Sequence, residues 1–183
     1  MKTFDLDKVG KAGSKFDPDK AKWFNHQYLI NKSDSELAEM FLPIIENKGF
    51  SASKDFVEKI CGMVKERINF IHDLWEQSWF FFQAPEEYDQ KMVKKKWKEH
   101  TPHLLSELKN RLQKLEEFTA ENIKETAKNI TEEKELGMGQ VMFPFRLTLV
   151  GAGMGPDVAE IAVMIGKEET IRRIEKAVDE IKK

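Results

Sequence analysis

Residues 33–44 read SDSELAEMFLPI, a stretch that joins a helix start signal to a helical repeat of apolar residues. Ser33 and Glu36 have the spacing of a capping box, in which each side chain binds a backbone amide at the start of a helix. Apolar residues then recur at intervals of three and four, at Leu37, Met40, Phe41 and Ile44. We expect a helix that Pro43 bends and that Gly49 ends.

Similar helix signals continue on both sides of this stretch, and period-two strand patterns are nearly absent. Asp17 and Pro18 mark the start of a helix that carries Trp23, Phe24, Tyr28 and Leu29. Further helices are expected at about 53–67, 70–82, 90–98, 102–117, 119–135, 140–150, 157–165 and 168–182. Pro144 should kink or restart its helix, and Pro156 is expected at the first position of the next one. The sequence therefore predicts an all-α fold.

Ala84-Pro85 interrupts the helical pattern and marks our predicted boundary between two small helical subdomains. We expect these subdomains to cover residues 33–88 and 89–183, with residues 1–32 as a separate leading segment.

The composition is that of a folded, soluble protein, with 183 residues of which 40% are hydrophobic and 34% charged. No apolar run is long enough to cross a membrane, and the charged N-terminus lacks a secretory signal. The single cysteine, Cys61, lies in an apolar helical pattern and has no partner for an internal disulfide. We therefore expect a buried core residue in a cytoplasmic protein. Four scattered histidines and one cysteine give no zinc-binding spacing.

The net charge of −2 does not by itself favour nucleic-acid binding, which needs Lys and Arg opposite phosphates. The charge is unevenly distributed, however. Residues 8–22 and 91–98 are locally basic, whereas residues 116–135 are acidic. The composition thus permits RNA binding without arguing for it.

The motifs of the common catalytic sites are absent from the sequence: there is no Walker loop, GxSxG, CxxC or metal-binding pair on a helix. Residues 151–155, GAGMG, precede a helix start, where glycine-rich turns can bind phosphate. Such signatures follow a strand, however, and this one follows an apolar helical segment. We expect a tight turn between helices.

The most basic patch is a lysine cluster around Trp97, formed by Lys91, Lys94, Lys95, Lys96 and Lys98. Basic side chains next to an aromatic ring can hold a nucleic-acid backbone and stack on a base. The same pattern also fits a solvated helix face on which Trp97 anchors the core.

Two arginines occupy otherwise apolar segments. Arg67 follows Val64 by three residues and Ile60 by seven, which predicts a position on the apolar face of its helix. There it must reach out to solvent, pair with an acid or point at an external ligand, unless it simply complements the end of the helix dipole. Arg146, close to Pro144, raises the same question.

Two blocks of sequence, one near each end, resemble bacterial glutamyl-tRNA synthetases. Residues 11–28, KAGSKFDPDKAKWFNHQY, resemble the segment that follows the catalytic domain of that family. Residues 139–168, GQVMFPFRLTLVGAGMGPDVAEIAVMIGKE, resemble its C-terminal signature in order and spacing.

The resemblance implies an α-helical cage that holds the anticodon loop of glutamate tRNA. Residues 1–32 would be the remnant of a region that contacts the inside of the tRNA, and 33–88 and 89–183 the two anticodon-binding subdomains. The parent glutamate–tRNA ligase would be monomeric and would use ATP and Mg in a catalytic domain outside this chain. The chain itself would hold no cofactor, metal or catalytic residue, and would bind neither DNA nor a membrane.

The resemblance also implies site residues. Arg67 corresponds to an arginine that distinguishes C from G at the third anticodon base, and its fan of donors suits cytosine O2 and N3. Arg146 corresponds to a contact of the first anticodon base. Gly155 falls in the same pocket but has no side chain to offer. Contacts to the tRNA backbone are expected from Lys11, Lys15, Lys94 and Lys95.

The alternative hypothesis is a non-enzymatic helical module that docks protein partners. RNA binding weakens steeply with rising salt, whereas a hydrophobic dock does not, so salt dependence separates the two.

Overall fold

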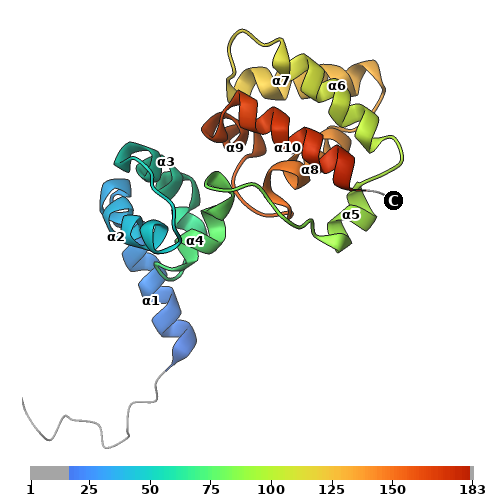
Figure 1. Cartoon of the computed structure of the whole chain (residues 1–183). Helices are drawn as coiled ribbons and strands as arrows, with labels where there is room; N and C mark the ends of the chain where they lie inside the picture. The colour runs from blue at the N-terminus through green and yellow to red at the C-terminus, as the bar shows by residue number, and fades with distance from the viewer. Residues whose placement is uncertain (1–16, 182–183) are drawn as a thin grey trace, which may run out of the picture.

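The computed structural model describes residues 17–181, and every regular element in this range is helical, which confirms the all-α prediction. Figure 1 shows two groups of helices joined by a narrow connection. The N-terminal helix group contains α1 (Pro18–Ile30), α2 (Asp34–Asn47), α3 (Lys54–Val64), α4 (Asp73–Ser78) and the 3₁₀ turns η2 (Lys65–Arg67) and η3 (Trp79–Phe81). The C-terminal helix group contains α5 (Gln90–Lys96), α6 (Thr101–Gln113), α7 (Ala120–Glu133), α8 (Gly139–Val150), α9 (Val158–Ile165) and α10 (Lys167–Glu180).

The predicted capping box at the start of α2 is confirmed. The amide of Glu36 donates to Ser33 Oγ at 3.2 Å, and the amide of Ser33 donates to Glu36 Oε2 at 2.9 Å. The bond from the Ser33 amide is the main reason why the pKa of Glu36 falls to about 2. At the other end Gly49, with φ of 86°, follows the last residues of the helix, as expected.

The core of the N-terminal helix group forms where α2 packs on α3. The apolar repeat predicted for α3 is fully buried at Val57, Ile60, Cys61 and Val64. Each such side chain stabilises the fold by about 1.5–3 kcal/mol relative to exposure. Burial raises the pKa of the Cys61 thiol to about 12, so this cysteine is a core residue and not a nucleophile.

Several helix boundaries differ from the sequence prediction. The helix expected at 102–117 ends at Gln113 in α6. The helix expected at 70–82 is limited to α4 and the turn η3, and the Asp73 carboxylate accepts the amides of Asn69 and Phe70 just before it. Pro156 does not occupy the first position of α9: Asp157 is the N-cap, and its carboxylate accepts the amides of Ala159 and Glu160. In contrast, α8 runs without interruption through Pro144.

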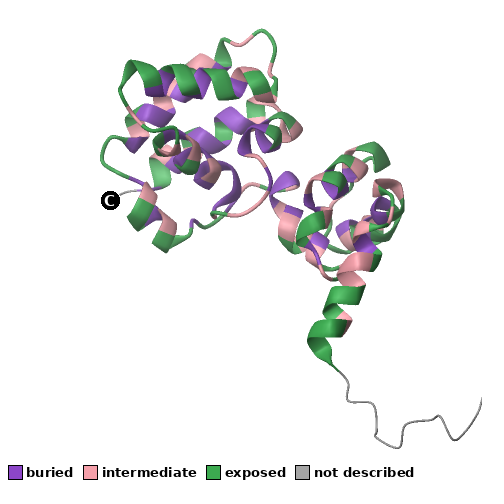
Figure 2. Cartoon of the chain, turned by 180° about the vertical axis from the view of Figure 1, so that it is seen from behind, coloured by how far each residue is buried: buried purple, intermediate pink, exposed green. Residues whose placement is uncertain are grey.

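α1 departs from the expected apolar pattern because only Leu29 of its residues is buried. Figure 2 shows that its first turns are mostly exposed. Trp23, Phe24 and Tyr28 each leave more than half of their surface open. The C-terminal part of α1 is the part that packs on the rest of the group.

A buried arginine that the sequence analysis did not single out connects the two helix groups. Arg173 of α10 is 2% exposed, and its Nη1 donates to the carbonyls of Phe80 at 2.8 Å and Leu149 at 2.7 Å. Its Nε donates to the Glu169 carboxylate at 2.7 Å. Nearby, Lys176 Nζ donates to the carbonyl of Pro85 at 2.8 Å. These bonds attach α10 to the connection between the groups. The assignment of residues 33–88 and 89–183 as separate subdomains stays a prediction.

Two further properties concern residues 17–181 as a whole. No helix in this range combines the length and apolar character needed to cross a membrane. Nor does the range contain a cluster of three or more His, Cys, Asp or Glu side chains suited to a metal ion.

Candidate nucleic-acid interface

Arg67 is exposed at the end of η2, and residues 17–181 supply no ion-pair partner for it. The predicted position on the apolar face is therefore wrong. The α-helix changes to a tighter 3₁₀ turn at Lys65, which alters the phase of the repeat, and Ile68 is the residue that enters the core. Arg67 is thus left free to point at an external ligand.

The chain that follows Arg67 is held from two sides. His26 Nδ1 of α1 lies 2.6 Å from the carbonyl oxygen of Ile68, and because that oxygen can only accept, this nitrogen carries the hydrogen. The Asn25 amide donates to the carbonyl of Asn69, whose own amide is bound by Asp73. These bonds fix the backbone from which Arg67 projects.

Arg146 of α8 is half-buried, and its Nη1 donates to the carbonyls of Met154 at 2.8 Å and Pro156 at 2.6 Å. Burial is the main cause that lowers the pKa of Arg146; the charge of Asp157 raises it, and the charge of Arg67 lowers it. The two predicted arginines belong to different helix groups.

Gly155 lies between the two carbonyls that bind Arg146, and its φ is +94°. A Cβ at this position would lie 3.0 Å from Phe80 Cζ and 3.4 Å from Ile161 Cδ1. The glycine therefore allows the loop to pass close to an aromatic ring of the other helix group in a left-handed conformation.

The whole glycine-rich segment 151–155 is a turn between α8 and α9, as expected. The carbonyl of Gly151 accepts the amide of Asp89 at 2.8 Å, which ties the turn to the connection between the helix groups. The first amides of α9 are taken by the Asp157 carboxylate, so this helix start does not offer a phosphate-binding site.

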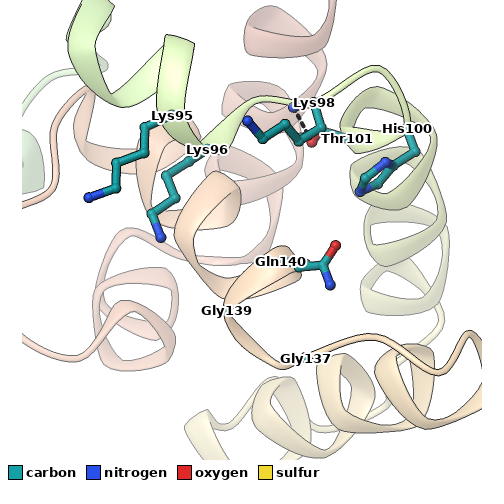
Figure 3. Close-up of a pocket in the computed structure, with 8 residues that line it drawn as sticks. All are labelled: Lys95, Lys96, Lys98, His100, Thr101, Gly137, Gly139 and Gln140. Carbon is teal, nitrogen blue, oxygen red and sulfur yellow. Dashed lines mark hydrogen bonds between the residues drawn. The ribbon is translucent and has the colours of Figure 1, made fainter.

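The lysine cluster on α5 faces solvent, and Trp97 anchors the core with 1% of its surface exposed. This burial excludes base stacking by Trp97. Lys94 and Lys95 are both exposed, whereas Lys11 and Lys15 lie outside the described residues. A cavity of about 340 Å³ opens beside the end of α5, and Figure 3 shows its lining: Lys95, Lys96, Lys98, His100, Thr101, Gly137, Gly139 and Gln140.

The aromatic residues after Ile71 mainly pack against one another. Phe80 and Phe81 are buried, and Trp75 stacks on Phe82 with ring centroids 5.7 Å apart. Two exposed rings were not predicted from the sequence. Phe70 stacks on His72, and Phe143 of α8 lies 4.1 Å below the Lys96 ammonium group. Phe143 stands inside the quoted C-terminal block, three residues before Arg146, and this spacing was a usable signal.

Comparisons with known proteins identify the family of the domain. The family model described as "Anticodon binding domain" matches residues 36–178. The glutamate–tRNA ligase of Flavobacterium psychrophilum is 52% identical over 97% of this chain and 35% of its own length. That of Phocaeicola vulgatus is 47% identical over 100% of the chain and 36% of its own length.

Solved structures show the same relationship. A crystal structure of a glutamate tRNA ligase from Elizabethkingia meningosepticum superimposes with a TM-score of 0.90 at 46% identity, over 98% of this chain and 36% of that one. The structure of the enzyme from Elizabethkingia anophelis superimposes with a TM-score of 0.85 at 45% identity, over 96% of this chain and 34% of that one. The chain spans about a third of the length of the relatives that it matches. On this evidence, the chain belongs to the anticodon-binding domain family.

Proposed function

We propose that this chain binds the anticodon loop of glutamate tRNA as part of a longer glutamate–tRNA ligase, with Arg67 and Arg146 as its base-contacting residues. The observation that carries this proposal is that Arg67 is exposed and has no acidic partner among residues 17–181, while two backbone carbonyls hold Arg146 in place. A guanidinium without an acidic partner favours a ligand rich in hydrogen-bond acceptors.

Arg67 suits a base that presents acceptors. Its guanidinium carries five N–H donors in a planar fan, which match O2 and N3 of an unstacked cytosine. A guanine at the same place would direct its own N1 and N2 hydrogens at these donors, so donors would face donors. On this basis Arg67 favours C over G at the third anticodon position.

Arg146 differs from Arg67 because it is already oriented. Its Nη1 is committed to the carbonyls of Met154 and Pro156, which leaves its remaining donors for a ligand. We assign it to the first anticodon base, and the carbonyl-bound loop around Gly155 then forms one wall of that pocket through its backbone.

The activity of the longer protein follows from its relatives and belongs to the same proposal. Glutamate would be attached to its tRNA with ATP and Mg by a catalytic domain outside this chain, in a monomeric, cytoplasmic enzyme that does not act on DNA. The chain itself contributes recognition.

The test is binding of the isolated chain to an anticodon stem-loop of glutamate tRNA, with C or G at the third anticodon position, at two salt concentrations. We expect tighter binding of the C form and a steep loss of affinity as salt rises. Absence of binding, or binding insensitive to salt, would contradict the proposal. Pyrophosphate exchange catalysed by the isolated chain with glutamate and ATP would also contradict it.

A further inference from the structure

One face of α8 leads from Arg146 towards the lysine-lined cavity. Gly139, Phe143 and Arg146 follow one another at intervals of four and three residues, so they lie on the same side of the helix. Gly139 and Gln140, at the start of α8, line the cavity. With a rise of about 1.5 Å per residue, Gln140 and Arg146 are roughly 9 Å apart along the axis. The arginine site and the cavity are thus neighbours on one continuous strip.

The cavity is strongly basic. Lys95, Lys96 and Lys98 line it, and none of them forms an ion pair with an acid within residues 17–181. Figure 3 shows the three lysine side chains and the amide of Gln140, with the Lys95 ammonium group pointing outwards, away from Gln140. The volume of about 340 Å³ is sufficient for a small anionic group such as a phosphodiester.

Phe143 occupies the strip between the cavity and Arg146. It is 42% exposed although it belongs to a helix whose neighbouring residues are mostly buried. The Lys96 ammonium lies 4.1 Å from its ring centroid, so the ring is held beside a cation that also lines the cavity. An exposed ring beside free lysines is the combination that binds single-stranded nucleic acid, whose bases stack while its phosphates meet positive charge.

We propose that Phe143 and the cavity lined by Lys95, Lys96 and Lys98 form a second RNA subsite, in which the cavity holds a backbone phosphate and Phe143 stacks on a base next to the one that Arg146 contacts. This inference rests on the proposed function, because it extends the same strip along α8. These three lysines are thereby assigned to one specific phosphate and not to a general attraction for the RNA backbone.

The first experiment compares two charge-matched double variants of the chain in binding to the anticodon stem-loop. Lys95→Gln with Lys98→Gln removes two charges from the cavity. Lys114→Gln with Lys128→Gln removes two charges from exposed lysines, one just after α6 and one on α7, that do not line it. We expect the cavity variant to lower the slope of log affinity against log salt by roughly 0.7, since the single phosphate held in the cavity contributes about 0.7 in a single strand. The control variant should retain the original slope.

The second experiment separates stacking from charge. Phe143→Leu should weaken binding roughly tenfold at every salt concentration, because a lost base–aromatic stack releases no counterions. Phe143→Tyr retains the ring and should bind within about twofold of the unsubstituted chain. Circular dichroism and the melting temperature verify that each variant remains folded.

The outcomes distinguish this subsite from the anticodon-binding function itself. If the cavity variant and its control have equal salt slopes, or if Phe143→Leu binds as tightly as Phe143→Tyr, the subsite is overturned while C-over-G preference survives. If the unsubstituted chain does not bind the stem-loop, the proposed function fails and the subsite with it. The subsite is supported if the cavity variant lowers the salt slope and Phe143→Leu lowers the affinity tenfold. In both variants the ratio of the affinities for the C and G stem-loops should stay unchanged.

Discussion

The positive charge of Arg67 lowers the pKa of Arg146, in addition to the larger effect of burial, although η2 and α8 belong to different helix groups. Residues 17–181 offer Arg146 two carbonyls and the charge of Asp157, and offer Arg67 no acid. Within residues 17–181 Arg146 is therefore held by the backbone whereas Arg67 has no acidic partner, and this difference directs the following predictions.

Arg67→Gln should reduce the preference for C over G at the third anticodon position towards equal binding. A base-reading arginine contributes about 1–3 kcal/mol of discrimination. Because Arg67 is exposed, stability should change by less than about 0.5 kcal/mol. Stem-loop binding and urea unfolding measure the two effects. In the full-length enzyme the same change should relax discrimination between glutamate and glutamine tRNAs, and unchanged charging ratios would refute the role.

Arg146→Met should affect both folding and binding. The carbonyls of Met154 and Pro156 lose their donor, which costs about 1–3 kcal/mol, and the loop that they belong to loosens. Stem-loop affinity should fall with either base at the third position, in contrast to Arg67→Gln. Urea unfolding together with binding titrations provides the check, and a variant with full stability would show that the two hydrogen bonds contribute nothing.

Gly155→Ala should destabilise the chain by about 1–2 kcal/mol, because φ of +94° is unfavourable for a residue with a Cβ. The added methyl group would also lie 3.0 Å from Phe80. Gly137→Ala is the matched control, since a Cβ there meets nothing within 4 Å. Equal melting temperatures for the two variants would argue against our account of this turn.

Arg173→Met should cost about 3–5 kcal/mol, because it leaves the Glu169 carboxylate and the carbonyls of Phe80 and Leu149 without their buried donor. Arg172→Met removes the other arginine bound to Glu169, but that pair is exposed and should cost less than about 1 kcal/mol. Chemical denaturation of both variants tests the difference. Similar losses would mean that Arg173 does not connect the helix groups.

Glu169 should make the stability sensitive to acid. Hydrogen bonds from Arg172, with a further contribution from Arg173, hold its pKa down to about 2 from an ordinary value of 4.5. Since the folded pKa is the lower one, the stabilisation is fully present above pH 4.5 and is lost as the pH falls towards 2. Unfolding free energies measured from pH 5 to 2.5 should therefore fall less steeply for Glu169→Gln than for Glu168→Gln. Parallel curves would exclude this contribution.

Local signals in the sequence predicted most of the helix framework. The capping box at Ser33 and Glu36, the glycine after α2 and the buried repeat of α3 depend on neighbours within a few residues, and the structure agrees with each. The errors arose where the helix type changes or where one of two adjacent residues decides the helix start. Arg67 left the apolar face because a 3₁₀ turn replaced the last helical turn, and Asp157 is the N-cap of α9 although Pro156 was expected to be its first residue.

By itself the sequence determined the all-α class and, through two blocks near its ends, the resemblance to a known family. Only the tertiary structure decided that Arg67 is exposed while Arg146 is held by two carbonyls, that Trp97 is core while Phe143 is open, and that Arg173 attaches α10 to Phe80. The physical reason is the distance along the chain over which each effect acts. Capping and periodicity act within a turn or two of helix, whereas burial and the electrostatic environment depend on segments that only folding brings together.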